Sequence, residues 1–336
     1  MSSLVLFGLL LTLVAGVFSG NCMLPMKFMR RWSWENAWLV FSLVSLVILP
    51  WFLAFALVPN VLEVYGNLRP GQFVVPLLFG FGWGIAQVLF GLSVTRLGLA
   101  LGYAVIIGLG ASLGTLVPLF FSHAELVATS KGALVLGGVA IMILGIVVSA
   151  IAGKQREAAE EKGPAKAGGS YGSAVIMAVI CGIMAPMLNF AFAFGLHIAD
   201  EAVRLGATPA SAAYAVWPVG LFGGLIPNLG YAIYLLNKNR TWDRFRTFVP
   251  DGGFATLMGI LWVGAIALYG VSSVYLGALG TSAGWALFQI FMIITANISG
   301  VVTGEWKRAP KPALRQLWAG LGLLAIATGV IAMGNR

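Results

Sequence analysis

Residues 97–104 read LGLALGYA and residues 279–286 read LGTSAGWA, so both segments follow the pattern LGx[AS]xG[YW]A. A further series of similar residues is related by a constant offset of 179 positions: Trp83 with Trp262, Phe90 with Tyr269, Gly91 with Gly270, Ser93 with Ser272, Leu97 with Leu276 and Gly98 with Gly277. Glycine-rich helices can resemble one another by composition alone, but here aromatic positions match as well as glycines. The sequence therefore predicts an internal repeat. Weaker pairs join Pro50 with Pro227 and Gly16 with Gly182.

Long apolar runs contain both segments and fill most of the chain. Hydrophobic residues make up 60% of the 336 residues and charged residues only 9%, whereas soluble proteins carry about 25% charged residues. A bilayer core about 30 Å thick requires roughly 20 helical residues. Ten runs have this length, near 3–24, 36–58, 71–94, 97–121, 132–152, 172–197, 211–236, 254–276, 279–303 and 316–334. We predict an all-α integral membrane protein with ten transmembrane helices.

The distribution of basic residues predicts the orientation of these helices. If the loops alternate between the two sides, 16 of the 20 Lys and Arg residues fall on one side and 4 on the other. The positive-inside rule places the richer side in the cytoplasm, so both termini are expected in the periplasm of an inner-membrane protein. Clustering between apolar runs explains the net charge of +9 better than a nucleic-acid partner does.

The most polar stretch, GKQREAAEEKGPAKAGG at 153–169, divides the chain into two parts. Its mixed charge, Gly and Pro predict a cytoplasmic linker at 153–171. Five spans then lie in 1–152 and five in 172–336. An odd number of spans per half gives the halves opposite orientations, as in secondary transporters built from inverted repeats, which bind substrate near the midplane and alternate its access.

Several short motifs occur along the chain: KFMRRWSWE at 27–35, ILPW at 48–51, Leu97-Gly98 with Gly102, Gly108, Gly114-Thr115 and Pro118, Asn228-Leu229-Gly230, and Glu305-Trp306. Together they resemble the motifs of the L-rhamnose/proton symporter family, in the drug/metabolite transporter superfamily. The similarity covers essentially the whole chain and lies mainly in Gly, Pro and Trp. The resemblance implies ten spans and sugar uptake.

The ionisable residues exclude several other classes of protein. All eleven acidic residues lie at or beyond predicted helix ends; a cationic drug exporter would be expected to carry an acid at mid-bilayer. The two cysteines and two histidines predict no metal site, and we expect no cofactor. The sequence contains no GxxxxGK[ST] motif, which argues against an ATP-driven pump. It also shows no catalytic triad or carboxylate pair, which argues against an enzyme. A channel stays an alternative that saturable, gradient-sensitive flux would distinguish.

A sugar presents hydroxyl groups on its edge and an apolar C–H face, so its site needs amides and aromatic rings in a concave pocket. Trp285 and Gln289 are four residues apart and share one helix face. We predict that Trp285 stacks on the sugar ring and Gln289 binds its hydroxyl groups. The alternative is that Gln289 bridges two helices and Trp285 only packs. Gln87 and Tyr103, the repeat partner of Trp285, are the next substrate-binding candidates.

Two asparagines complete the predicted substrate site. Asn21 and Asn189 lie near Pro25 and Pro186, where a helix break would free backbone carbonyls. Structural capping of such a break is the alternative role for one of the two. Trp217-Pro218 and Pro227-Asn228, with the glycines between them, predict a kink in the seventh span.

Proton coupling would use His197 and Asp200, three residues apart at the outer end of the sixth span. The alternative is a solvated loop pair. We expect Glu35 and Glu305 to pair with Arg30, Arg31 or Lys307 and to anchor helix ends.

These observations predict a secondary active transporter that imports a neutral deoxyhexose-type sugar, similar to L-rhamnose, by proton symport with alternating access. The alternative is an exporter or exchanger of another small metabolite, a nucleoside or an amino acid, on the same fold. No buried Arg or Lys is predicted to bind an amino-acid carboxylate. The expected partners are the sugar, protons and membrane lipid, and the expected state is a monomer or homodimer.

Overall fold

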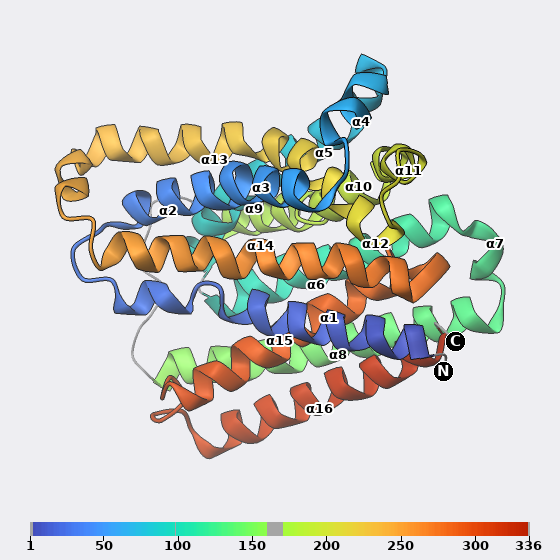
Figure 1. The fold of residues 1–336 in the computed structure, drawn as a ribbon. Coiled ribbons are helices and arrows are strands. Elements are labelled where there is room, and N and C mark those ends of the chain that lie inside the picture. The colour runs from blue at the N-terminus through green and yellow to red at the C-terminus, as the bar shows by residue number, and fades with distance from the viewer. Residues whose placement is uncertain (1–2, 98, 160–170, 335–336) are drawn as a thin grey trace.

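The computed structural model describes residues 3–97, 99–159 and 171–334, which form helices and no strand (Figure 1). Ten helical segments in this part of the chain are long and apolar enough to cross a membrane. The prediction of an all-α membrane protein with ten spans is therefore confirmed. Gly98 and residues 160–170 of the predicted linker lie outside the described residues.

Several spans are built from more than one helical element. The first five spans are, in chain order, α1 (Ser3–Asn21) with η1 (Leu24–Phe28); α2 (Trp34–Leu43), η2 (Val44–Ile48) and α3 (Leu49–Leu57); α5 (Pro70–Leu97); α6 (Leu99–Ser122); and α8 (Ser130–Ala159). The second five are α9 (Tyr171–Met184), α10 (Met187–Ala193) and α11 (Leu196–Arg204); α12 (Pro209–Ala212), η3 (Ala213–Ala215) and α13 (Trp217–Asn239); α14 (Asp251–Leu276) with η5 (Gly277–Leu279); α15 (Ala283–Val302); and α16 (Lys311–Gly334). Shorter elements between spans are α4 (Val61–Asn67), α7 (Ala124–Val127) and η4 (Trp242–Arg246).

Two prolines lie where a helical element ends within a span. α1 ends at Asn21 and is followed by a 3₁₀ turn that contains Pro25. α9 ends at Met184, and Pro186 is the N-cap residue of α10. Proline removes a backbone donor and clashes with the preceding turn, so the helical ladder is interrupted at these points. The predicted breaks near Pro25 and Pro186 are confirmed.

The two ends of the bundle differ in charge. α1 begins and α16 ends on the side of α4, α7, α11 and α12, whereas η1 and η4 lie at the opposite side (Figure 1). That opposite side is called the basic end here, because its loops carry Lys27, Arg30, Arg31, Arg244 and Lys307. α8 reaches this end and continues through Ala159.

Helix packing follows the same pattern when spans 1–5 are compared with spans 6–10. α1 packs against α14 and α15, and its counterparts α9 and α10 pack against α5 and α6. α13 packs against α5, and its counterparts α2 and α3 pack against α14. Equivalent spans also contact each other directly, among them α8 with α16, α6 with α15, and α2 with α13.

The same correspondence holds for single residues. A Cβ atom at Gly16 would lie 2.3 Å from Cβ of Phe291, and one at Gly182 would lie 2.8 Å from Cβ of Leu109. Leu109 and Phe291 are related by the offset that relates residues 97–104 to residues 279–286. The paired residues Trp83 and Trp262 stack on each other with ring centroids 5.3 Å apart. Each glycine therefore permits an equivalent close approach of two helices.

Filling one of these approaches should destabilise the bundle. We predict that Gly16→Leu lowers the free energy of unfolding by about 1–3 kcal/mol, because the added side chain forces α1 away from α15. Gly137→Leu on the exposed face of α8 is the matched control, since a Cβ atom there meets nothing within 4 Å. Thermal unfolding in detergent would measure both variants. Equal melting temperatures for the two variants would contradict the packing described.

Candidate functional site

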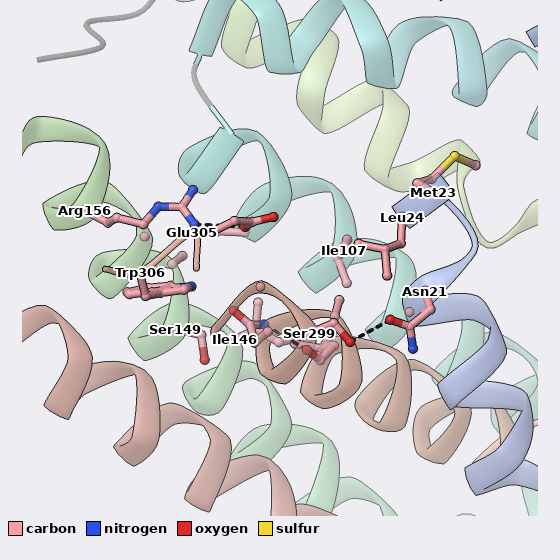
Figure 2. A pocket seen from close by; sticks show the side chains of 18 of the residues that line it. Asn21, Met23, Leu24, Ile107, Ile146, Ser149, Arg156, Ser299, Glu305 and Trp306 are labelled. Carbon is pink, nitrogen blue, oxygen red and sulfur yellow. Dashed lines mark hydrogen bonds and ion pairs between the residues drawn. The ribbon is translucent and has the colours of Figure 1, made fainter. Parts of the chain in front are cut away.

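A partly open cavity of about 320 Å³ lies between α1, η1, α6, α8 and α15, toward the basic end of the bundle. Figure 2 shows Arg156, Glu305 and Trp306 on one side of it and Asn21 and Leu24 on the other. A cavity of this size can hold a small metabolite.

Two asparagines line the interior of this cavity. Oδ1 of Asn21 accepts a hydrogen bond of 2.6 Å from the Ser299 hydroxyl, and its Nδ2 donates to the carbonyl of Val17 at 2.9 Å. Nδ2 of Asn297 donates to the carbonyl of Ile293 at 2.8 Å. A side-chain amide offers two donors and two acceptor positions, so both asparagines keep capacity for a ligand. The structure thus places Asn21, but none of the other predicted substrate residues that it describes, in the cavity wall.

The mouth of the cavity carries three charged side chains and an indole ring. The Glu305 carboxylate accepts hydrogen bonds from the Lys27 ammonium and, at 3.4 Å, from Nη1 of Arg156. The Arg156 guanidinium lies over the Trp306 ring, 5.0 Å from its centroid. The expected pairing of Glu305 with Arg30, Arg31 or Lys307 is wrong, because the turn after α15 brings this carboxylate against η1 and α8.

The expected partners of Glu35 are also wrong. This buried carboxylate accepts hydrogen bonds from the Thr241 hydroxyl at 2.8 Å and the Asn239 amide at 3.1 Å. The backbone N–H groups of Arg30 and Arg31 donate instead to Asp251 at the start of α14. Glu35 and Asp251 therefore both anchor helix ends, largely through neutral hydrogen-bond donors. The sequence predicts this anchoring role for Glu35.

Asn189 and Trp285 lie farther from the basic end than the cavity does, and both contact Tyr269 and carbonyl groups of α6. The fully buried Asn189 amide donates to the carbonyls of Gly114 and Thr281, both at 2.9 Å, and accepts from the Tyr269 hydroxyl. Nε1 of Trp285 donates to the Gly110 carbonyl at 3.2 Å. Neither Asn189 nor Trp285 lines the cavity.

Three aromatic rings surround this network. Trp285 meets Tyr269 edge to face at 5.5 Å, and Phe288 stacks on Tyr269 at 5.3 Å. We call Asn189, Tyr269, Trp285 and Phe288 the closing cluster, because they fill the space between α6, α10, α14 and α15. The Trp285 ring is only 5% exposed.

Gln289 lies between the closing cluster and the cavity. It follows Trp285 by one helical turn, and Ile293, one turn further along α15, lines the cavity. The residue is 8% exposed, and its side chain forms no hydrogen bond with a described residue, but its amide atoms are not among the fully buried polar atoms that lack a partner. The amide therefore keeps donor and acceptor capacity for a ligand.

The remaining predicted residues lie elsewhere or are not described. Gln87 is half-buried on α5, one turn after Trp83. The side chain of Tyr103 lies outside the described residues. On α11, His197 shares a hydrogen bond with the Gln72 carbonyl at 3.0 Å, and Asp200 is exposed. Their roles in binding and proton coupling stay predictions.

Several residues of the cavity were not singled out from the sequence. Asn297 shares the α15 face of Trp285 and Gln289, so helical spacing could have found it. Arg156 and Ser299 gave no comparable signal, because they face the cavity only through contacts between distant segments. Among the described residues, no cluster of three or more His, Cys, Asp or Glu side chains could hold a metal ion.

Ten apolar spans that surround a partly open cavity are typical of a multi-pass membrane transporter. The family model described as L-rhamnose-proton symport protein matches residues 1–336, so the chain belongs to this family. It is 29% identical over 333 residues to the L-rhamnose-proton symporter of Mannheimia succiniciproducens, with 95% of each chain covered. It is 26% identical over 343 residues to the symporter of the same name from Escherichia coli, with 99% of each covered. The match of the family model confirms the predicted family. These relatives are named as transporters and not as enzymes.

The closing cluster yields a test of its own. We predict that Tyr269→Phe lowers the free energy of unfolding by about 1–3 kcal/mol, because the Asn189 carbonyl oxygen loses its donor in a buried site. Tyr275→Phe is the matched control on the same helix, since the Tyr275 ring packs edge to face on Phe7. Thermal unfolding would measure both. A Tyr269→Phe protein as stable as the control would show that the network adds little.

Proposed function

We propose that this protein imports a neutral deoxyhexose, such as L-rhamnose, by proton symport. One observation carries the proposal: the Gln289 amide, which forms no hydrogen bond with a described residue, lies between the cavity and the closing cluster of aromatic residues. The membership in the L-rhamnose-proton symport family and the names of the relatives from Mannheimia succiniciproducens and Escherichia coli support the same substrate class.

The chemistry of the cavity fits a neutral sugar. Asn21, Asn297 and Gln289 offer amide donors and acceptors that match the hydroxyl groups of a monosaccharide. Ile107, Ile146 and Ile293 give the cavity an apolar side for the C–H face of the ring. Tyr269 and Phe288 cover the Trp285 ring. In this state the ring therefore lies one helical turn from Gln289, on the side away from the basic end.

Asn189 has a structural role in this proposal. Its amide uses two donors and one acceptor on protein groups from three different segments. This supports the alternative reading of one predicted asparagine as a structural residue, whereas Asn21 is the one in the cavity. Gln87 and Tyr103 remain candidates for contacts made in another state of the transport cycle.

We also propose that residues 1–152 and 172–336 are inverted repeats joined by the linker at 153–171. The equivalent packing of Gly16 with Phe291 and of Gly182 with Leu109 supports this division, as does the Trp83–Trp262 stack between paired residues. Two halves of similar structure and opposite orientation can exchange conformations, which moves the opening from one side of the membrane to the other.

The basic end is the cytoplasmic end in this proposal, in an inner membrane. The bias of 16 to 4 in Lys and Arg supports that orientation, and it places both termini in the periplasm. The cavity described above then opens toward the cytoplasm, and the closing cluster separates it from the periplasm. In this proposal the structure represents an inward-facing state.

Reconstituted protein in liposomes tests the substrate and the site. We expect saturable uptake of L-rhamnose driven by an inward proton gradient. Gln289→Ala should weaken sugar binding roughly tenfold, the effect of losing about one hydrogen bond to a buried amide. Asn237→Ala is the matched control, because this exposed amide lies at the end of α13 and bonds Trp242. A protein that moves a nucleoside or an amino acid but no sugar under any gradient would disprove the proposal.

A further inference from the structure

The carboxylate of Glu305 lies between two cations at the mouth of the cavity. One oxygen contacts the Lys27 ammonium, and the other lies 3.4 Å from Nη1 of Arg156. The Lys27 ammonium also donates to the Thr303 hydroxyl at 3.3 Å. The Glu305 side chain is 37% exposed, so water can reach it. Figure 2 shows this carboxylate beside Arg156, facing the same cavity as Asn21.

These contacts connect the two proposed halves of the protein. Lys27 belongs to η1, after the first span, and Arg156 lies near the end of the fifth span. Glu305 follows the ninth span. The two ion pairs therefore connect Glu305, from the second half, with Lys27 and Arg156, from the first half, at the mouth of the cavity. A change in the charge of Glu305 acts directly on this contact between the halves.

The other acids near the basic end are less suited to bind a transported proton. Asp251 accepts hydrogen bonds from three successive backbone N–H groups, and Glu35 accepts from Thr241 and Asn239. Protonation of Asp251 or Glu35 would weaken these anchoring hydrogen bonds and would leave the cavity unchanged. Among the described acids, Glu157 and Glu305 line the cavity, and of these two Glu305 is the one that bridges Lys27 and Arg156.

Protonation of Glu305 would change the electrostatics of the mouth. The charged groups that face it are Lys27 from η1, Arg156 and Glu157 from α8, and Lys307, whose stem packs on Gly304. A neutral Glu305 would leave Lys27 and Arg156 without the anion that holds them together. Their mutual repulsion, at an effective dielectric far below that of water, would favour a wider mouth.

From this geometry we propose that Glu305 is the proton-binding carboxylate of symport. The proposal rests on the function proposed above. A proton that arrives with the sugar from the periplasm, in a state whose periplasmic side is open, forms an O–H bond with the Glu305 carboxylate, which breaks both ion pairs and widens the cytoplasmic mouth. The O–H bond then breaks, the proton passes to cytoplasmic water, and the carboxylate recovers Lys27 and Arg156. The structure, with both pairs formed, is the deprotonated state.

This arrangement couples proton and sugar by linkage. Both ligands favour the open mouth, so each raises the apparent affinity of the other, and the two effects are equal. The proposal therefore predicts a pH dependence of sugar binding that depends on the Glu305 carboxylate and that a purely structural ion pair would not produce.

Glu305→Gln in reconstituted protein tests the proposal through two modes of transport. We expect this variant to lose sugar accumulation driven by an inward proton gradient while it retains counterflow of labelled L-rhamnose without a gradient. The affinity for L-rhamnose, which should change by about 5-fold to 150-fold between acidic and alkaline pH in the unmodified protein, should become independent of pH. Asp243→Asn is the matched control, since this exposed carboxylate at the same end pairs with Arg246. It should behave like the unmodified protein.

Three results would overturn the proposal. Accumulation by Glu305→Gln at the unmodified proton-to-sugar ratio would exclude Glu305 as the proton site. Equal loss of counterflow and accumulation would mean a structural ion pair. Loss of coupling in His197→Gln with coupling retained in Glu305→Gln would assign the proton to α11. If Glu305→Gln does not fold, Glu305→Asp replaces it, and a pH profile identical to that of the unmodified protein would count against the proposal.

Failure of the proposed function gives a different result. An unmodified protein that exchanges L-rhamnose but never accumulates it against a gradient would overturn proton coupling, and with it the role of Glu305. An unmodified protein that neither binds nor exchanges L-rhamnose would contradict the sugar assignment itself.

Discussion

The side-chain amide of Asn189 joins four segments of the chain, and the closed side of the cavity depends on it. It bonds α6 through Gly114, the turn before α15 through Thr281, and α14 through Tyr269. Within a membrane each of these groups must find its partner inside the protein. The break at Pro186 starts the short helix α10 that carries Asn189. With this amide satisfied, Tyr269, Trp285 and Phe288 pack into one cluster.

The cavity on the other side of Gln289 differs from this cluster. Amide, charged and apolar side chains line it, and it reaches the end of the bundle where the basic loops gather. α15 connects the two regions: Trp285 belongs to the closing cluster, Gln289 lies at the boundary, and Asn297 lines the cavity. A transporter of alternating access requires one open and one closed side around a binding position. We propose that Gln289 lies at that position.

Much of the fold could be predicted from the sequence because span length and repeat spacing are local properties. The apolar runs gave the ten spans, and Pro186 gave the break before Asn189. Contacts between distant segments could not be predicted in this way. The sequence predicts that Trp285 stacks on a sugar ring, but it gives no sign that α14 brings Tyr269 against this side chain. Likewise, Lys27 and Glu305 are 278 positions apart, and no local pattern pairs them.

The central claim is that a sugar occupies the cavity from the basic end, beside Asn297. Labelling of Asn297→Cys with a membrane-impermeant thiol reagent tests it, in protein whose buried Cys22 and Cys181 are replaced by Ala. In inside-out vesicles, which expose the cytoplasmic side, we predict that the reagent reacts and that L-rhamnose slows the reaction while a nucleoside does not. Reaction only from the periplasmic side, or reaction unaffected by L-rhamnose, would contradict the account.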